Sequence, residues 1–257
     1  MLPGKKYTES EIKTILACPR LYRLKGSINN YDISQKFLRY AFNLLVLKLL
    51  KNDIDDLDKA MNTCVNKSFR KFYLHNNFIE NEIARLRQYA FSFMHNFLIR
   101  FDLRSYDILL GPTRPTYTLG DISIELNIDA ILKPKNRKKQ MHAVIFYPFI
   151  DNNVINNDFT LKMKADYLKT FAASSINKNK YSEVNIHLVS SKKFNVYQSK
   201  YKGPRLYMKS LRYDEINHKG YEPLLKRLPE LASNSSPPPL CSFMKCSKRK
   251  ECADEPW

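Results

Sequence analysis

Four of the five cysteines lie near the two ends of the sequence, and a set of four thiolates is well suited to hold a soft metal. Three of them fall within 12 positions, at Cys241, Cys246 and Cys252. The fourth is Cys18, in the sequence Ala17-Cys18-Pro19-Arg20-Leu21-Tyr22. Four thiolates close either a zinc site or an iron–sulfur cluster. The pattern therefore predicts a metal site that joins the C-terminal segment to an N-terminal helix.

Disulfide bonds or inert thiols are the alternative interpretation of these cysteines. Five is an odd number, and Met1–Lys6 lacks the apolar run of a secretion signal. These features favour a reducing, cytoplasmic setting, in which stable disulfides are rare. Cys64, alone in a helical stretch, is expected to be an ordinary buried thiol. We therefore favour the metal site.

The composition indicates a folded, strongly basic protein. Its 257 residues, 44% of them hydrophobic, are enough for one sizeable core. The net charge of +18 predicts a polyanionic partner, with nucleic acid preferred over a membrane surface. The alternative is a solvated basic surface in a lysine- and asparagine-rich proteome. The longest apolar run, Phe42–Leu50, is broken by Asn43 and Lys48, so no membrane-spanning segment is expected.

Residues 1–105 are expected to form a mainly helical part that carries Cys18. Thr8-Glu9-Ser10-Glu11 is a capping box, which predicts a helix that begins there and reaches Pro19. Apolar residues at helical spacing predict three further helices, over Ile33–Lys51, Asp55–Tyr73 and Ile79–Arg100.

Residues 106–232 are expected to form a mixed sheet with a crossover helix, and residues 233–257 a linker and the cysteine segment. Period-two or continuous apolar patterns predict strands over Tyr106–Thr118 (interrupted), Ile122–Leu132, Met141–Ile150 and Glu183–Ser190. The crossover helix is predicted over Thr160–Ile176. Asn195–Leu211 is expected to be a loop or hairpin, and Asp214–Leu231 a helix broken by prolines. The three parts together predict one composite α/β (α+β) domain.

This order of features resembles the RecB-like branch of the PD-(D/E)XK nucleases, which have a restriction-endonuclease-like mixed sheet. More narrowly, it is similar to the iron–sulfur members: the AddB nuclease domain and the small CRISPR spacer-adaptation exonucleases. The resemblance implies a four-iron–four-sulfur cluster, with zinc as the alternative, bound by Cys18, Cys241, Cys246 and Cys252. Four residues separate Cys241 from Cys246, where the family usually has two, whereas the next gap of five fits.

The catalytic pattern of that family is only partly present. The resemblance implies Mg²⁺ or Mn²⁺ held by carboxylates, with Asp129 as the strand-end aspartate and Tyr167 as the crossover-helix tyrosine. Phe146 and Pro148 occupy the acid and lysine positions of the next strand, and Met163 stands where glutamine is usual. One carboxylate is a poor site for an ion that needs several oxygen ligands. We therefore expect a catalytically degenerate centre; an ordinary strand-end role for Asp129 is an equal alternative.

Basic segments interleaved with tyrosines predict where DNA binds. They are Lys133–Lys139, Lys178–Lys180, Lys192–Arg205 and Lys245–Lys250. Lysine and arginine would neutralise phosphates while tyrosines stack on unpaired bases, so single strands or DNA ends are the expected ligands, with a protein partner as a second expectation. The alternative is a set of solvated loops. The candidate residues are Lys135, Arg137, Lys138, Lys139, Tyr197, Tyr201, Lys202 and Arg205.

Three functions are open from the sequence. The preferred one is a DNA-binding nuclease-fold protein with an iron–sulfur cluster and a degenerate catalytic centre. The second is an active metal-dependent DNA exonuclease whose acidic ligands come from the set Asp121, Glu125, Asp129 and Asp151. The third is a zinc-stapled scaffold with no nucleic-acid function.

Overall fold

The computed structural model describes residues 6–18, 22, 33–51, 54–73, 80–146, 158–174, 181–191, 206–216 and 221–233. The three C-terminal cysteines and the candidate DNA contacts Tyr197, Tyr201, Lys202 and Arg205 lie outside these residues. The chain divides into two compact units, each built from separate stretches of sequence. The first comprises residues 1–30, 114–127 and 217–257, and the second comprises residues 31–113 and 128–216. These boundaries differ from the three consecutive parts that the sequence suggests.

The described residues of the first unit include a three-stranded sheet and short helices. The strands β1 (Lys6–Thr8), β3 (Thr116–Leu119) and β4 (Ile122–Glu125) are ordered β1-β4-β3, with β1 parallel and β3 antiparallel to β4. Gly120 turns the chain between β3 and β4 with a φ of 58°, a conformation that glycine adopts without a steric penalty. The helices are α1 (Glu9–Ala17), α8 (Tyr221–Lys226) and α9 (Leu228–Ser233).

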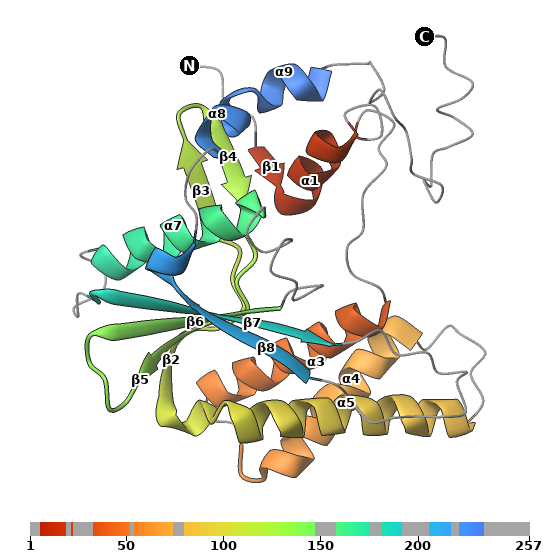
Figure 1. Cartoon of the computed structure of the whole chain (residues 1–257). Coiled ribbons are helices and arrows are strands. Elements are labelled where there is room, and N and C mark those ends of the chain that lie inside the picture. Colours follow the sequence, from red (N-terminus) through yellow and green to blue (C-terminus); the bar gives the residue numbers. More distant parts are fainter. Residues whose placement is uncertain are drawn as a thin grey trace, which may run out of the picture. The chain divides into compact units, whose positions relative to one another are not determined.

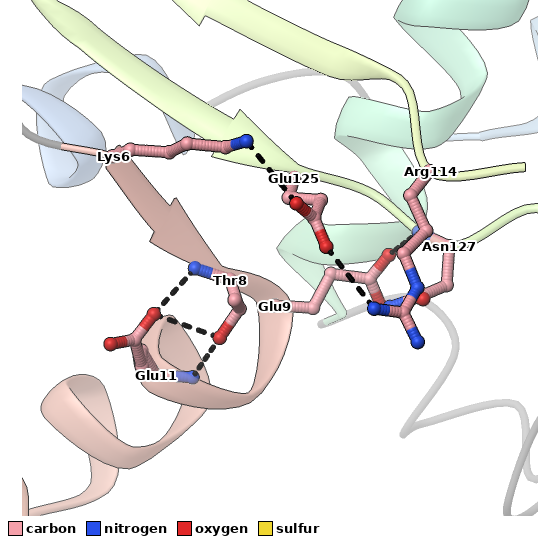
Figure 2. A network of polar contacts seen from close by, with 7 residues as sticks. All are labelled: Lys6, Thr8, Glu9, Glu11, Arg114, Glu125 and Asn127. Carbon is pink, nitrogen blue, oxygen red and sulfur yellow. Dashed lines mark hydrogen bonds and ion pairs between the residues drawn. The ribbon is translucent and has the colours of Figure 1, made fainter.

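The predicted capping box at the start of α1 is confirmed. The backbone N–H of Glu11 donates to Thr8 Oγ1 over 3.2 Å, and the N–H of Thr8 donates to Glu11 Oε2 over 2.7 Å. Figure 2 shows this box beside a second group of polar contacts, in which Glu125 accepts ion pairs from Lys6 at 3.2 Å and Arg114 at 3.6 Å. These contacts attach the N-terminal strand and helix to β4.

Within the described residues, the second unit contains a five-stranded mixed sheet together with helices, which confirms the predicted α/β fold class. Its strands are β2 (Tyr106–Leu110), β5 (Ala130–Pro134), β6 (Gln140–Phe146), β7 (Glu183–Ser191) and β8 (Leu206–Arg212). They are ordered β2-β5-β6-β7-β8, and only β6 and β7 run parallel to each other. The crossover between those two strands contains the helix α7 (Phe159–Ala173), as expected for a parallel connection.

Helices cover both faces of this sheet (Figure 1). α3 (Ile33–Leu50), α4 (Leu57–Tyr73) and α5 (Glu80–Arg100) pack on one face, and α7 packs on the other. Alternate residues of β6 supply the two cores: Val144 and Phe146 face α3 and α5, whereas Ala143 and Ile145 face α7. Among the helices that the structure describes, none has the length and apolar character needed to cross a membrane.

The predicted strand Ile122–Leu132 is wrong in its extent. The apolar residues that define it, Ile122, Ile124, Leu126 and Ile128, are all buried as expected. However, the chain leaves β4 after Glu125 and enters β5 at Ala130, so the stretch supplies one strand to each sheet. Alternation of apolar and polar residues indicates which side chains are buried, but not where a strand ends. Two successive strands whose buried residues have the same parity therefore produce one continuous pattern.

Candidate functional site

Asp129 lies just before β5 and is completely buried. Its Oδ1 accepts hydrogen bonds from Arg39 Nε at 2.6 Å and from Asn43 Nδ2 at 3.1 Å, both on α3. Its Oδ2 accepts a hydrogen bond from the backbone N–H of Phe146 at 2.8 Å. The carboxylate therefore joins helix α3 to two neighbouring strands of the sheet.

This set of partners leaves Asp129 little capacity to bind a metal. A carboxylate offers about four lone-pair sites, and three are used by these donors. The guanidinium of Arg39 also supplies the positive charge that a buried carboxylate requires. No group of three or more His, Cys, Asp or Glu side chains is arranged to hold a metal among the described residues. The metal assignment of Asp129 stays a prediction, and its contacts support the structural alternative.

The other positions of the expected catalytic pattern are apolar or lie elsewhere. The ring of Phe146 is buried between α3 and α5, with its centroid 5.0 Å from that of Phe42 and 6.0 Å from that of Phe93. Met163 is fully buried on α7. Tyr167 is half-buried in the α7 core, where burial raises its pKa. The sheet thus separates Tyr167 from the carboxylate of Asp129, which points towards α3.

The remaining acids of the candidate set fall in the other unit or outside the described residues. Asp121 and Glu125 belong to the first unit, whereas Asp129 belongs to the second. Glu125 is engaged by Lys6 and Arg114. Asp151 and Pro148 lie outside the described residues.

The turn between β5 and β6 carries four cationic side chains in five exposed residues: Lys135, Asn136, Arg137, Lys138 and Lys139. We refer to residues 135–139 as the basic turn. In the part of the chain that the structure describes, no acidic side chain forms an ion pair with its three lysines. The basic turn therefore presents uncompensated positive charge to solvent.

Backbone hydrogen bonds hold the basic turn in place. The N–H of Lys135 donates to the carbonyl of Ser105 over 3.0 Å. The carbonyl of Lys139 accepts hydrogen bonds from the N–H groups of Ser182 and Glu183, at 3.0 and 3.2 Å. One end of the turn is thus attached to the segment before β2, and the other end to the segment before β7. Its cationic side chains therefore extend from a fixed backbone.

Asp129 and the basic turn lie at opposite ends of β5. Ala130 pairs with Val144 at one end, and the turn follows Pro134 at the other. A strand rises about 3.3 Å per residue, so about 20 Å separates Asp129 from Lys135, which lie on either side of this five-residue strand. A phosphate bound at the turn would consequently lie far from the carboxylate of Asp129.

Cys18 is the one predicted thiolate ligand within the described residues, and its assignment as a ligand stays a prediction. It forms the C-cap of α1, with its N–H donating to the carbonyl of Thr14 over 2.8 Å, and it is 3% exposed. Helix α9 packs against α1 and ends at Ser233, eight positions before Cys241. The helix that ends at Cys18 therefore contacts the helix that leads into the cysteine segment.

Sequence reasoning missed a row of polar side chains across β6, β7 and β8. His142 Nδ1 lies 2.7 Å from His187 Nε2, and His187 Nδ1 lies 2.8 Å from Ser210 Oγ. The pKa of each imidazole is lowered to about 4, chiefly by burial, and the neighbouring His142 contributes to the shift of His187. Parity within each strand could indicate which residues face the same side, but the register that aligns the three strands comes only from the structure.

The sequence matches no protein-family model and no curated protein. The resemblance to RecB-like nucleases therefore rests on the residues quoted for it.

Proposed function

We propose that this protein binds DNA phosphates through the basic turn and that its nuclease-like centre does not cleave DNA. The observation that carries the binding proposal is the cluster of four exposed cations on an anchored turn. Lysine and arginine that neutralise phosphates release condensed counterions, and this release favours binding without reading the base sequence. The net charge of +18 would add long-range attraction.

Loss of cleavage follows from the contacts of Asp129. Metal-dependent phosphodiester cleavage needs an ion that orients and activates water next to the bound phosphate. Arg39, Asn43 and the Phe146 amide already occupy the carboxylate, and the turn that would bind phosphate lies at the other end of β5. The centre thus serves as a packing contact between α3 and the sheet.

The proposal includes a metal centre formed by Cys18, Cys241, Cys246 and Cys252. A four-iron–four-sulfur cluster is favoured, with zinc as the alternative. Support comes from the buried thiol of Cys18 at the end of α1 and from the packing of α9 against that helix. Such a centre would fix the C-terminal segment in place. It would not take part in the chemistry of DNA cleavage.

Fluorescence anisotropy of labelled DNA tests the binding site. Replacing Lys135, Arg137, Lys138 and Lys139 by glutamine should weaken binding at least tenfold at moderate salt, because four phosphate contacts are lost. The matched control replaces four exposed cations of α4, namely Lys59, Lys67, Arg70 and Lys71, by glutamine. Both variants lose the same charge, so equal affinities for the two variants would contradict the assignment of the turn.

A parallel incubation tests the loss of cleavage. End-labelled single- and double-stranded DNA should remain intact with Mg²⁺ or Mn²⁺ under conditions in which the protein binds it. Degradation that disappears in folded Asp129→Asn protein would show that the centre is active.

A further inference from the structure

A continuous chain of side-chain contacts runs from the surface hydroxyl of Ser210 to the carboxylate of Glu183. Ser210 on β8 is exposed and contacts His187 on β7, which contacts His142 on β6. His142 Nε2 lies 3.3 Å from Gln140 Oε1, and Gln140 Nε2 donates to Glu183 Oε2 over 2.6 Å.

The donors and acceptors of this chain agree except at His142 Nε2, where Asn185 Nδ2 at 3.4 Å competes with the shorter contact to Gln140 Oε1 at 3.3 Å. A carboxylate only accepts, so Gln140 directs its amide nitrogen to Glu183 and its oxygen to His142. His142 then carries its proton on Nε2 and accepts on Nδ1 from His187 Nε2–H. His187 Nδ1 is consequently the acceptor for the hydroxyl proton of Ser210. The shorter contacts, which end at the Glu183 carboxylate, thus favour these tautomers of both imidazoles.

Packing holds the two imidazoles in this orientation. The Phe101 ring contacts His187 with centroids 4.7 Å apart, and the Tyr106 ring contacts His142 at 5.2 Å. His142 and His187 are 9% and 8% exposed. Rotating either ring by a half-turn would place carbon where these short contacts require nitrogen. The hydroxyl is therefore accessible while its base is enclosed.

We propose that Ser210 is a nucleophile for acyl and phosphonyl groups, with His187 as its general base and His142 as the residue that positions His187. A nucleophile within hydrogen-bond reach of a base that a third group orients is the arrangement that activates serine. In acyl transfer, Ser210 Oγ forms a bond to the carbonyl carbon while its proton passes to His187 Nδ1. The ester C–O bond then breaks, and the leaving alkoxide takes up a proton as the alcohol.

The groups around His142 and His187 determine how readily each imidazole accepts a proton. Burial and the positive charge of Arg137 lower the pKa of His142 to about 4, while Glu183 acts in the opposite direction. Burial and His142 lower the pKa of His187 to about 4. His187 is therefore neutral and ready to accept a proton throughout the pH range from 6 to 8. A base this weak makes Ser210 slow, so a strongly activated reagent is the suitable probe.

An alkyl fluorophosphonate applied to the full-length protein tests the proposal, with peptide mass spectrometry as the readout. Ser210 Oγ attacks phosphorus, fluoride leaves, and the hydroxyl proton passes through His187 to solvent. We expect one phosphonyl group on the peptide that contains Ser210. The labelling rate should fall at least tenfold in His187→Gln protein and should stay constant between pH 6 and pH 8.

Ser105 provides an internal comparison, because it is exposed and its hydroxyl donates to Asp102 Oδ2 over 2.9 Å without an imidazole neighbour. Ser105 should remain unlabelled. Equal labelling of Ser105 and Ser210, an unchanged rate in His187→Gln protein, or no label at Ser210 would each overturn the proposal. A Ser210→Ala variant removes only an exposed hydroxyl, and its thermal unfolding checks that the fold is retained.

Discussion

Asp129 is a buried carboxylate whose charge is balanced by the guanidinium of Arg39, a side chain that is 23% exposed. Asp129 is fully buried, and Arg39 is its only cationic partner among the contacts that the structure gives for its carboxylate. Removing one member of such a pair costs about 3 to 5 kcal/mol, because the remaining charge is left desolvated. The stability of the second unit should therefore depend on this contact.

Arg39→Ala protein is expected to lose about 3 kcal/mol of unfolding free energy in urea titrations, by this desolvation argument. Arg104→Ala is the control, because Arg104 pairs with Asp102 at the surface, where its side chain is 80% exposed. Exposed pairs contribute little, so the control should remain close to wild type. Similar losses in the two variants would contradict the buried-pair account.

The histidine pair makes stability depend on pH. Both folded pKa values are about 4, below the ordinary value of 6.5, so the folded state favours neutral rings. Between these values the unfolded chain binds more protons, and the stabilisation present above pH 6.5 is lost as the pH falls towards 4. Each ring contributes a slope of up to about 1.4 kcal/mol per pH unit.

Urea midpoints measured at pH 7.5 and pH 5.0 check this prediction. Wild-type protein should be less stable at pH 5.0, and the difference should shrink when His142 and His187 are both replaced by glutamine. His95→Gln is the control, because His95 is exposed on α5. If the double variant keeps the full pH dependence of stability, groups other than these two histidines cause that dependence.

Individual residues could be identified as candidates from the sequence, but the residues that they contact could not. Asp129 was recognised from its place at a strand end, whereas Arg39 lies 90 positions away and has no local signal that connects the two. His142 and His187 likewise lie 45 positions apart, with no local signal that connects them. Alternation gives the side of a strand on which a residue lies, and contacts across a sheet require strand order and register.

At the scale of elements, local signals predicted helices better than sheet membership. The capping box set the start of α1, and helical periodicity placed α3, α4 and α5 within a few residues of their observed ends. The sequence did not predict that the short β1 pairs with β4, since three residues carry almost no periodicity. The basic segment Lys133–Lys139 could be identified from its cluster of cations after a strand pattern, and the structure shows residues 135–139 exposed.

At the scale of the molecule, the predicted metal centre would link segments more than 200 positions apart. Metal that binds only the folded state stabilises it, so losing one thiolate should lower both metal content and stability. Anaerobically purified wild-type protein is expected to contain iron and sulfide, or else one zinc ion. Cys18→Ser protein should lose most of this metal, whereas Cys64→Ser should keep it, because Cys64 is buried on α4 in the second unit. Wild-type protein without iron or zinc would refute the centre.

The division into two units lay beyond the reach of sequence reasoning. Each unit combines distant stretches, and the chain crosses between the units at residues 30–31, 113–114, 127–128 and 216–217. Gly111, Pro112 and Pro115 lie beside the second crossing, but they were interpreted as an interruption within a strand. The predicted consecutive parts followed changes of secondary structure instead.

The salt dependence of DNA binding tests the central claim most directly, because it counts phosphate contacts. Plots of log affinity against log salt concentration should be compared for wild type, the glutamine variant of the basic turn and the α4 control variant. Losing four contacts should reduce the steepness of the slope by about 3 to 4, since each contact contributes about 0.7 to 0.9. The α4 variant should keep the wild-type slope. An unchanged slope in the turn variant, or equal reductions in both variants, would contradict binding through the basic turn.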